Sequence, residues 1–134
     1  MSGLENFLFH AHSGLRWLVV LASIIAIIWL GRAAITGQAY DRLTHRVVVI
    51  WSGLFGLQWI LGLILFVVLG GFDIRQRWEH LIIMTVALAL AHAYVPLKRR
   101  ADSLRVRGAL ASVVGVLVLV YLGVVVLGPG RWSF

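Results

Sequence analysis

The chain has 134 residues, of which 61% are hydrophobic and only 13% are charged, and its mean hydropathy is +0.97. Soluble domains have roughly half their residues apolar, so this composition excludes a soluble enzyme and a disordered chain and predicts a membrane protein. The length suits a single transmembrane domain, residues 1–134. The absence of cysteine excludes disulfides, thiolate metal sites and iron–sulfur clusters. The net charge of +7 does not require a nucleic-acid partner, because basic loops also fix membrane topology.

Four apolar stretches are each close to the roughly 20 residues that a helix needs to cross the hydrocarbon core. They cover about residues 14–35, 47–69, 80–97 and 110–127. The first stretch is predicted to remain as a helix rather than a signal peptide, because Glu5 precedes it where a basic region should stand. Since the connections are short, successive helices should be antiparallel. We therefore expect an all-α, up-down-up-down four-helix bundle.

Basic residues are concentrated in the first and third connections. Eight of the twelve lie there, namely Arg32, Arg42, Arg46, Lys98, Arg99, Arg100, Arg105 and Arg107. Cytoplasmic loops of membrane proteins carry such an excess of Lys and Arg. These two loops should therefore be cytoplasmic, in contact with anionic lipid headgroups. Both termini should lie on the outer, periplasmic side of a bacterial inner membrane.

Polar side chains inside membrane spans are costly, so the few that occur are candidates for function. His12 opens the first predicted helix and His80 the third. Because both helices run inward, the two imidazoles should lie at the same outer depth on diagonal helices, where they could ligate the iron of a haem b from both faces. Arg16, one turn after His12, could pair with a haem propionate or with Glu79. The alternative is an interfacial histidine and an arginine that reaches the headgroups.

Two further histidines leave alternatives open. His92 lies 12 residues after His80, which is about 18 Å along a helix and about 120° around it. It could join His45 in holding a second haem near the cytoplasmic side, although His45 also fits a solvated loop. A simple zinc or copper site could be built from His10, His12, Glu79 and His80.

The second helix places Gln58 in the middle of the membrane, near Gly53, Gly56 and Gly62. Helix packing is the simpler use of this stretch, and a quinone carbonyl, a haem propionate or a histidine nitrogen are the other possible partners for the amide. The fourth helix has small residues and no ligand-type side chain, so it is predicted to serve in packing. Its small residues are Gly108, Ala111, Ser112, Gly115 and Gly123.

Several motifs resemble those of a family of small four-helix bacterial membrane proteins described as cytochrome b-like, and more loosely those of the cytochrome b561 class. They are HSGLRW (12–17), LQWILG (57–62) and WEHLIIM (78–84), with AHAY (91–94) downstream. The chain departs from the family pattern at Gly56, where members often carry a histidine. The resemblance implies haem-ligand roles for His12 and His80, and for His92 if there is a second haem. It also implies that Arg16 and Gln58 lie beside the cofactor and that electrons are exchanged with quinone.

The first functional hypothesis is thus a b-type cytochrome-like membrane protein that passes electrons between quinone and a redox partner. Group-transfer chemistry is not expected, because phosphate-binding loops, HExxH and a nucleophile elbow are missing. The alternative is a non-catalytic accessory subunit of a larger respiratory or photosynthetic membrane complex, or a homo-oligomer. A transporter is a weaker alternative, since an acidic residue in mid-membrane is missing and four short helices leave little room for alternating access.

Overall fold

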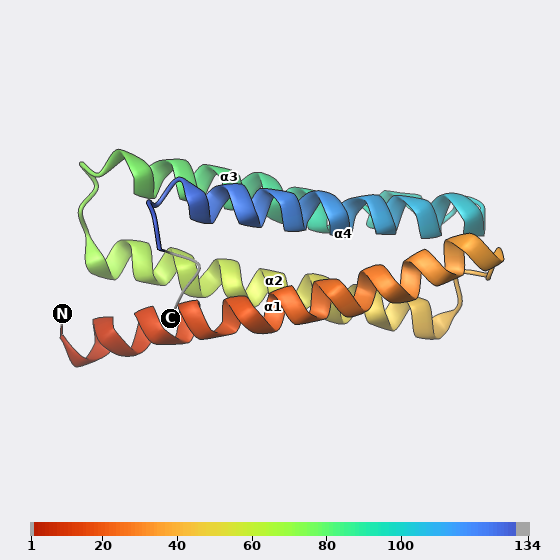
Figure 1. The fold of residues 1–134 in the computed structure, drawn as a ribbon, viewed down its shortest axis with the longest axis horizontal. Helices are drawn as coiled ribbons and strands as arrows, with labels where there is room; N and C mark the ends of the chain where they lie inside the picture. Colours follow the sequence, from red (N-terminus) through yellow and green to blue (C-terminus); the bar gives the residue numbers. More distant parts are fainter. Residues whose placement is uncertain (1, 131–134) are drawn as a thin grey trace.

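The computed structural model describes residues 2–130 and consists of four long helices joined by short connections (Figure 1). The helices are α1 (Gly3–Thr36), α2 (Arg42–Leu69), α3 (Arg75–Ala91) and α4 (Asp102–Val125), with a 3-10 helix η1 (Val95–Leu97) between α3 and α4. Successive helices run in opposite directions, and the start of α1 and the end of α4 lie at the same end of the molecule (Figure 1). The all-α fold with four long helices is confirmed.

The helices begin earlier than the apolar stretches predicted. α1 starts at Gly3 rather than near residue 14 because Ser2 and Glu5 form a capping box. The Ser2 hydroxyl accepts a hydrogen bond from the Glu5 N–H (3.3 Å), and the Glu5 carboxylate accepts one from the Ser2 N–H (2.6 Å). His12 consequently lies well inside α1, not at its start.

The other boundaries also follow local chemistry. α2 begins after Asp41, whose carboxylate accepts a hydrogen bond from the Thr44 N–H at 2.8 Å. This hydrogen bond lowers the pKa of Asp41 below its ordinary value. α3 begins at Arg75 and ends at Ala91, short of the predicted residue 97. The chain then turns into η1, which contains Pro96, a residue without the N–H that a continuing α-helix needs.

Each helix packs against two neighbours. α1 packs against α2 and α4, and α3 packs against α4 and α2. α1 and α3 therefore lie on a diagonal of the bundle, as the sequence predicts. The core between the helices is apolar and includes Val48, Phe55 and Val113. Buried Trp51 donates its indole N–H to the Ser23 hydroxyl at 2.9 Å, which ties α2 to α1.

The small residues of α4 lie where α3 and η1 approach. A Cβ at Gly108 would collide with Leu97, one at Gly115 with Leu90, and one at Gly123 with Met84. The predicted packing role is thus confirmed at the three glycines, because larger side chains would push the elements apart. Ser112 is also buried, whereas Ala111 is exposed in the single chain.

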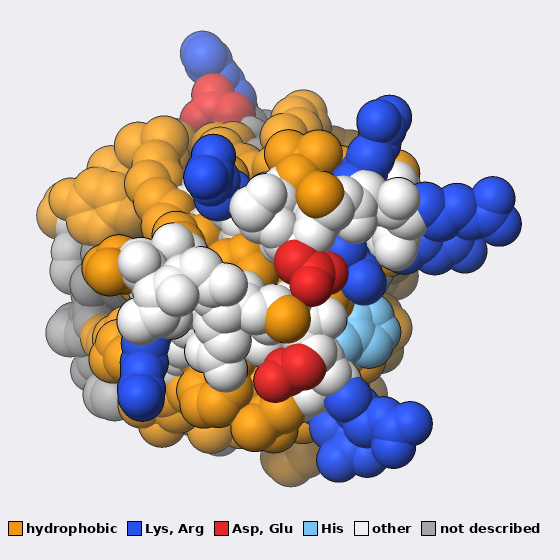
Figure 2. Space-filling model, turned by 90° about the vertical axis from the view of Figure 1, so that its right-hand side faces the viewer, with side chains coloured by type: hydrophobic (Ala, Val, Ile, Leu, Met, Phe, Trp, Pro, Cys, Tyr) orange, Lys and Arg blue, Asp and Glu red, His pale blue; other side chains and the backbone are white. Residues whose placement is uncertain are grey.

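All four helices are long and apolar enough to cross a membrane, which indicates a multi-pass membrane protein. Large apolar side chains are exposed along the sides of the bundle, among them Ile28, Ile50 and Val118. Figure 2 views the end that carries the first and third connections and shows Lys and Arg side chains around its edge. At this end the Arg105 guanidinium lies 3.9 Å from the centre of the Tyr40 ring. Burial raises the pKa of Tyr40, and the charge of Arg105 opposes that shift.

Candidate functional site

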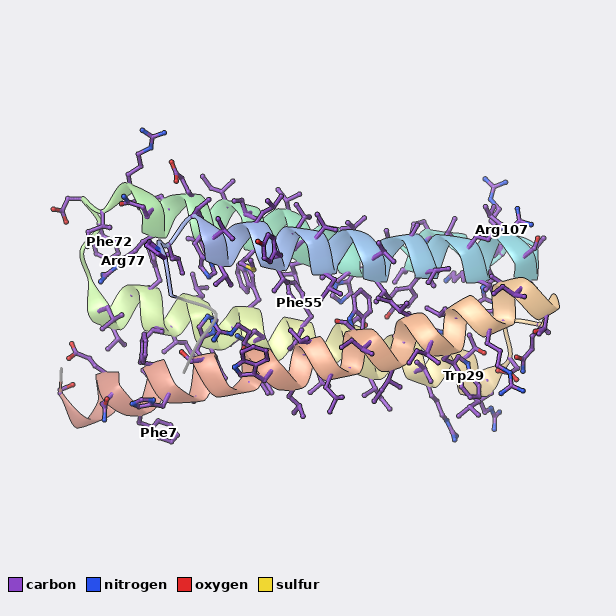
Figure 3. All side chains as sticks on the ribbon, in the orientation of Figure 1. Phe7, Trp29, Phe55, Phe72, Arg77 and Arg107 are labelled. Carbon is purple, nitrogen blue, oxygen red and sulfur yellow. The ribbon has the colours of Figure 1, made fainter. Side chains whose placement is uncertain are left out.

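A cavity of about 480 Å³ lies in the half of the bundle where α1 and α3 begin. Its volume is within the range of about 300–1,000 Å³ that is usual for cofactor and ligand sites. All four helices line it, and its lining is mainly apolar. The main polar contributors are His10, His12, Arg16, Gln58, Arg77 and His80. Figure 3 shows Phe55 in the interior of the bundle and Arg77 near the end where α3 begins.

The two histidines predicted to meet across the bundle do so. The ring centroids of His12 and His80 lie 6.4 Å apart, and the ring planes are at 89° to each other. Two metal–nitrogen bonds of about 2.0 Å, plus about 1.2 Å from each nitrogen to its ring centre, give a centroid separation of about 6.4 Å. The separation of the ring centres therefore matches two imidazoles that share one metal ion, and it also lies within the range of about 4.5–7 Å that is usual for edge-to-face ring contacts.

The end of α4 fixes the protonation of His80. Its Nδ1 lies 2.6 Å from the backbone oxygen of Gly123. A carbonyl only accepts hydrogen bonds, so Nδ1 carries the hydrogen and, in the neutral ring, Nε2 keeps a lone pair. Gly123 is in the last turn of α4, where carbonyls lack partners within the helix. Histidines that bind metals are commonly oriented by such a hydrogen bond from the other ring nitrogen.

Gly62 on α2 provides the space for the His12 ring. A Cβ at Gly62 would lie 2.8 Å from Cε1 of His12, closer than real side chains approach, whereas Gly53 and Gly56 have no neighbour within 4 Å of such an atom. Within residues 2–130, Nδ1 of His12 is buried and has no hydrogen-bond partner. A buried polar atom without a partner needs an explanation, and a role in binding a ligand is one.

The side-chain amide of Gln58 on α2 contacts the same histidine residue. Gln58 donates from Nε2 to the backbone oxygen of His12 at 2.8 Å. Its partner is thus the backbone of His12, not a ring nitrogen. Oε1 of Gln58 is buried and makes no hydrogen bond to the described part of the chain. The amide therefore holds α1 in register with α2, and its oxygen has no hydrogen-bond partner among residues 2–130.

Arg16 also lines the cavity, with its guanidinium 5.3 Å from the centre of the Trp17 ring. The suggested pair between Arg16 and Glu79 is wrong, because Glu79 binds Arg75 at 2.6 Å, four residues before it on the exposed side of α3. Arg77 lines the cavity too, although it was not predicted from the sequence. Its position three residues before His80 places it on the same face of α3, and this spacing was the available signal.

His45 and His92 lie outside the cavity, toward the opposite end of the bundle. Nδ1 of His45 lies 3.1 Å from the Tyr40 hydroxyl, and Nδ1 of His92 lies 3.0 Å from the backbone oxygen of Leu88. Both rings are exposed and contact Tyr94, with centroid separations of 6.2 and 6.4 Å. The structure therefore brings together His12, His80, Arg16 and Gln58 and separates His92 from them.

The alternative zinc or copper site is wrong. Among residues 2–130, no three His, Asp or Glu side chains gather closely enough to hold a metal ion. Two imidazoles would supply only two ligands to a metal ion. The others would have to come from water or from a group that brings its own ligands, such as a metal macrocycle.

Comparison with models of protein families finds no match to this chain, and comparisons with curated proteins and with solved structures also find none. The residues present fit haem b on three counts: the separation of the imidazoles, the free Nε2 of His80, and a largely apolar cavity.

Proposed function

We propose that this chain is a b-type cytochrome-like electron-transfer protein of the bacterial inner membrane, with one haem b held between His12 and His80. The single observation that carries this proposal is the pair of imidazoles 6.4 Å apart inside a cavity of about 480 Å³. Bound there, haem b would supply one-electron redox chemistry. The surrounding residues orient the two ligands, and the apolar lining excludes water.

The protein's own groups set the conditions for that chemistry. Gly123 holds His80 through Nδ1, and Gln58 holds the backbone at His12. Cationic Arg16 lines the same cavity. A positive charge near a redox centre favours its reduced form, because reduction adds a negative charge. We propose quinone or a partner redox protein as the electron partner, since the cavity lies at the end of a bundle with lipid-compatible sides.

The test is a reduced-minus-oxidised absorption spectrum with a pyridine haemochrome assay on the full chain purified in detergent. We expect one haem b per chain in the wild type and loss of the six-coordinate spectrum in His12→Ala and His80→Ala. His92→Ala distinguishes one haem from two, because its ring lies outside the cavity and a chain with one haem should keep its spectrum unchanged in this variant. A colourless protein, or a spectrum indifferent to both cavity substitutions, would refute the proposal.

The same purified sample can be used to count the haems per chain and to identify the electron donor. Two haems per chain would implicate His45 and His92 as a second pair, and a loss of half the pigment in His92→Ala would identify it. Addition of a short-chain quinol to the oxidised protein should produce the reduced spectrum if quinone is the partner. Reduction by dithionite alone would instead direct the search to a protein donor.

We propose that both termini face the periplasm, supported by the basic first and third connections. The chain has no cysteine, so an introduced cysteine would be the only thiol in the protein that a labelling reagent could modify. In spheroplasts, which lack an outer membrane but keep the inner membrane intact, Ser2→Cys should react with a membrane-impermeant maleimide. Ser103→Cys should react only after lysis. The reverse pattern would overturn the orientation.

A second candidate is an accessory subunit of a larger membrane complex. The observation that favours it is that α3 is the least buried of the four helices and exposes Ile82 and Val86 on its outer face. Purification in mild detergent distinguishes the two functions. A colourless chain that remains with a large complex supports the accessory role, and a coloured chain that migrates alone supports the cytochrome.

A further inference from the structure

Trp59 on α2 lines the cavity from a depth that is unusual for a tryptophan of a membrane protein. Such tryptophans gather at the two membrane interfaces, at the level of the lipid headgroups. Trp59 lies about 15 Å along the helix from the end of α2 at Leu69, at the end of the bundle where α3 begins (Figure 1). It therefore lies below the headgroups, and an interfacial role does not account for it.

The indole of Trp59 is tied to α3 by a hydrogen bond on the outside of the bundle. Its Nε1 donates to Oγ1 of Thr85 at 3.2 Å, and the same hydroxyl donates to the backbone oxygen of Leu81 at 2.8 Å. Thr85 is exposed and does not line the cavity. The indole thus extends from the cavity to the outer surface, and its N–H and the threonine hydroxyl both have partners there.

The interface between α2 and α3 is the least extensive of the four helix interfaces. In the half of α3 beside the cavity, residues 75–86, no side chain is buried, and the buried residues of this helix are Ala87 and Ala91. The neighbouring interface between α1 and α2 includes the buried hydrogen bond from Trp51 to Ser23. Segments with few buried contacts open locally at low cost in free energy. The start of α3 is therefore the part of the cavity wall that moves most easily.

The seam between α2 and α3 is closed on both sides of Trp59. Toward the loop that joins the two helices, Phe66 packs edge to face on Trp78, with ring centroids 4.9 Å apart. Toward the other end of the bundle, the hydroxyls of Ser52 and Tyr94 are 3.1 Å apart and link α2 to the segment after α3. The hydrogen bond of Trp59 lies between these two regions, so it holds the seam where the cavity lies behind it.

We propose that Trp59 and Thr85 form a lateral entrance, through which an apolar ligand dissolved in the hydrocarbon core of the membrane reaches the cavity. Ile60 and Ile82 are exposed beside the pair, so the entrance opens to lipid and not to water. When the indole swings outward, its N–H loses its partner and no water replaces it, which keeps the entrance closed at rest. On the proposed function the ligand is haem b, so the inference rests on that function.

The test measures how fast the ligand enters and leaves. The full chain is reconstituted without cofactor in lipid vesicles and mixed with haemin, association is followed by the Soret absorbance, and dissociation by transfer of haem to excess apomyoglobin. Thr85→Val keeps the shape of the side chain and removes the acceptor of the indole N–H. The entrance is closed in both the empty and the loaded protein. We therefore expect both rate constants to rise by the same factor, about two- to tenfold, with Kd unchanged.

Three further variants accompany Thr85→Val. Trp59→Phe keeps an aromatic ring without the N–H and should also raise both rates. Thr85→Ser retains the hydroxyl and should return the rates to those of the wild type. Trp29→Phe is the matched control, because it removes a similar hydrogen bond, 3.0 Å long, from an indole to Thr44, and neither residue lines the cavity. It should leave both rates unchanged.

The outcomes separate the entrance from the haem site. Unchanged rates in both Thr85→Val and Trp59→Phe would show that the ligand enters elsewhere, which refutes the entrance and leaves the haem site standing. Faster dissociation alone, with weaker affinity, would mean that the pair stabilises the loaded state and does not gate entry, which also refutes it. If haemin does not bind the wild type, the proposed function fails and this inference with it. Equal increases confined to variants that break the hydrogen bond support both.

Discussion

Replacing Gly62 by alanine should displace the His12 ring, and the structure gives the size of the displacement. The new Cβ would lie 2.8 Å from Cε1 of His12, about 0.7 Å inside the distance of about 3.5 Å at which carbon atoms ordinarily touch. Metal–ligand distances tolerate errors of only about 0.2 Å. A ring displacement of about 0.7 Å exceeds this tolerance, so on the proposed function we expect His12 to be weakened or lost as a haem ligand.

Gly56→Ala is the matched control, since it lies in the same helix and a Cβ added there would have no neighbour within 4 Å. Both substitutions gain about 0.5–1 kcal/mol of helix stability from alanine over glycine. In Gly62→Ala the added methyl group also crowds the His12 ring, and such overpacking costs about 1–3 kcal/mol of stability. The two variants should consequently differ by about 1–3 kcal/mol in unfolding free energy, with Gly62→Ala the less stable.

The assay is thermal unfolding in detergent together with the oxidised absorption spectrum. We expect Gly56→Ala to match or exceed the wild type in stability and to retain the six-coordinate spectrum. Gly62→Ala should shift toward a five-coordinate spectrum and unfold at a lower temperature. Equal stability and identical spectra in the two variants would show that His12 does not depend on the space at Gly62.

Three other predictions concern the scaffold. Ser23→Ala removes the acceptor of the buried Trp51 indole N–H and should cost about 1–3 kcal/mol in thermal unfolding, so an unchanged melting temperature would contradict the pairing. The pKa of Asp41 is lowered in the folded chain by the hydrogen bond from Thr44, so its stabilisation is present above the unfolded pKa of about 3.9 and is lost as pH falls through the folded value. The stability gap between wild type and Asp41→Ala should accordingly be constant near neutral pH and narrow in acid, and a gap that widened in acid would reverse this reasoning. Gln58→Glu should destabilise the bundle more than Gln58→Leu, because it sets a carboxylate against the carbonyl that the amide now binds, as equilibrium unfolding in detergent would show.

Hydropathy and local chemistry in the sequence were enough to predict the four helices and the diagonal placement of His12 and His80. Helix starts were predicted less well, because an apolar stretch marks the part of a helix that suits lipid and not the whole helix. Ser2 with Glu5, and Asp41 with Thr44, extend α1 and α2 through polar residues. These capping patterns are short and could be read directly from the chain.

The details of the candidate site depended on residues far apart in sequence. Which glycine of α2 accommodates His12 depends on how α1 rotates against α2, and periodicity alone does not distinguish Gly53, Gly56 and Gly62. The hydrogen bond from His80 to Gly123 spans 43 residues and forms because α4 ends beside the start of α3. Arg77 likewise enters the site only because the loop before α3 folds back on its guanidinium.

The sequence by itself thus determined the helical class, the number of long apolar helices and the end of the bundle to which the two histidines belong, because hydropathy, charge and helical rise act along the chain. Only the tertiary structure decided the 6.4 Å separation of the imidazoles, the protonated nitrogen of His80 and the cationic lining of the cavity. Those features arise from packing between helices, where each contact depends on the shape and rotation of two surfaces at once.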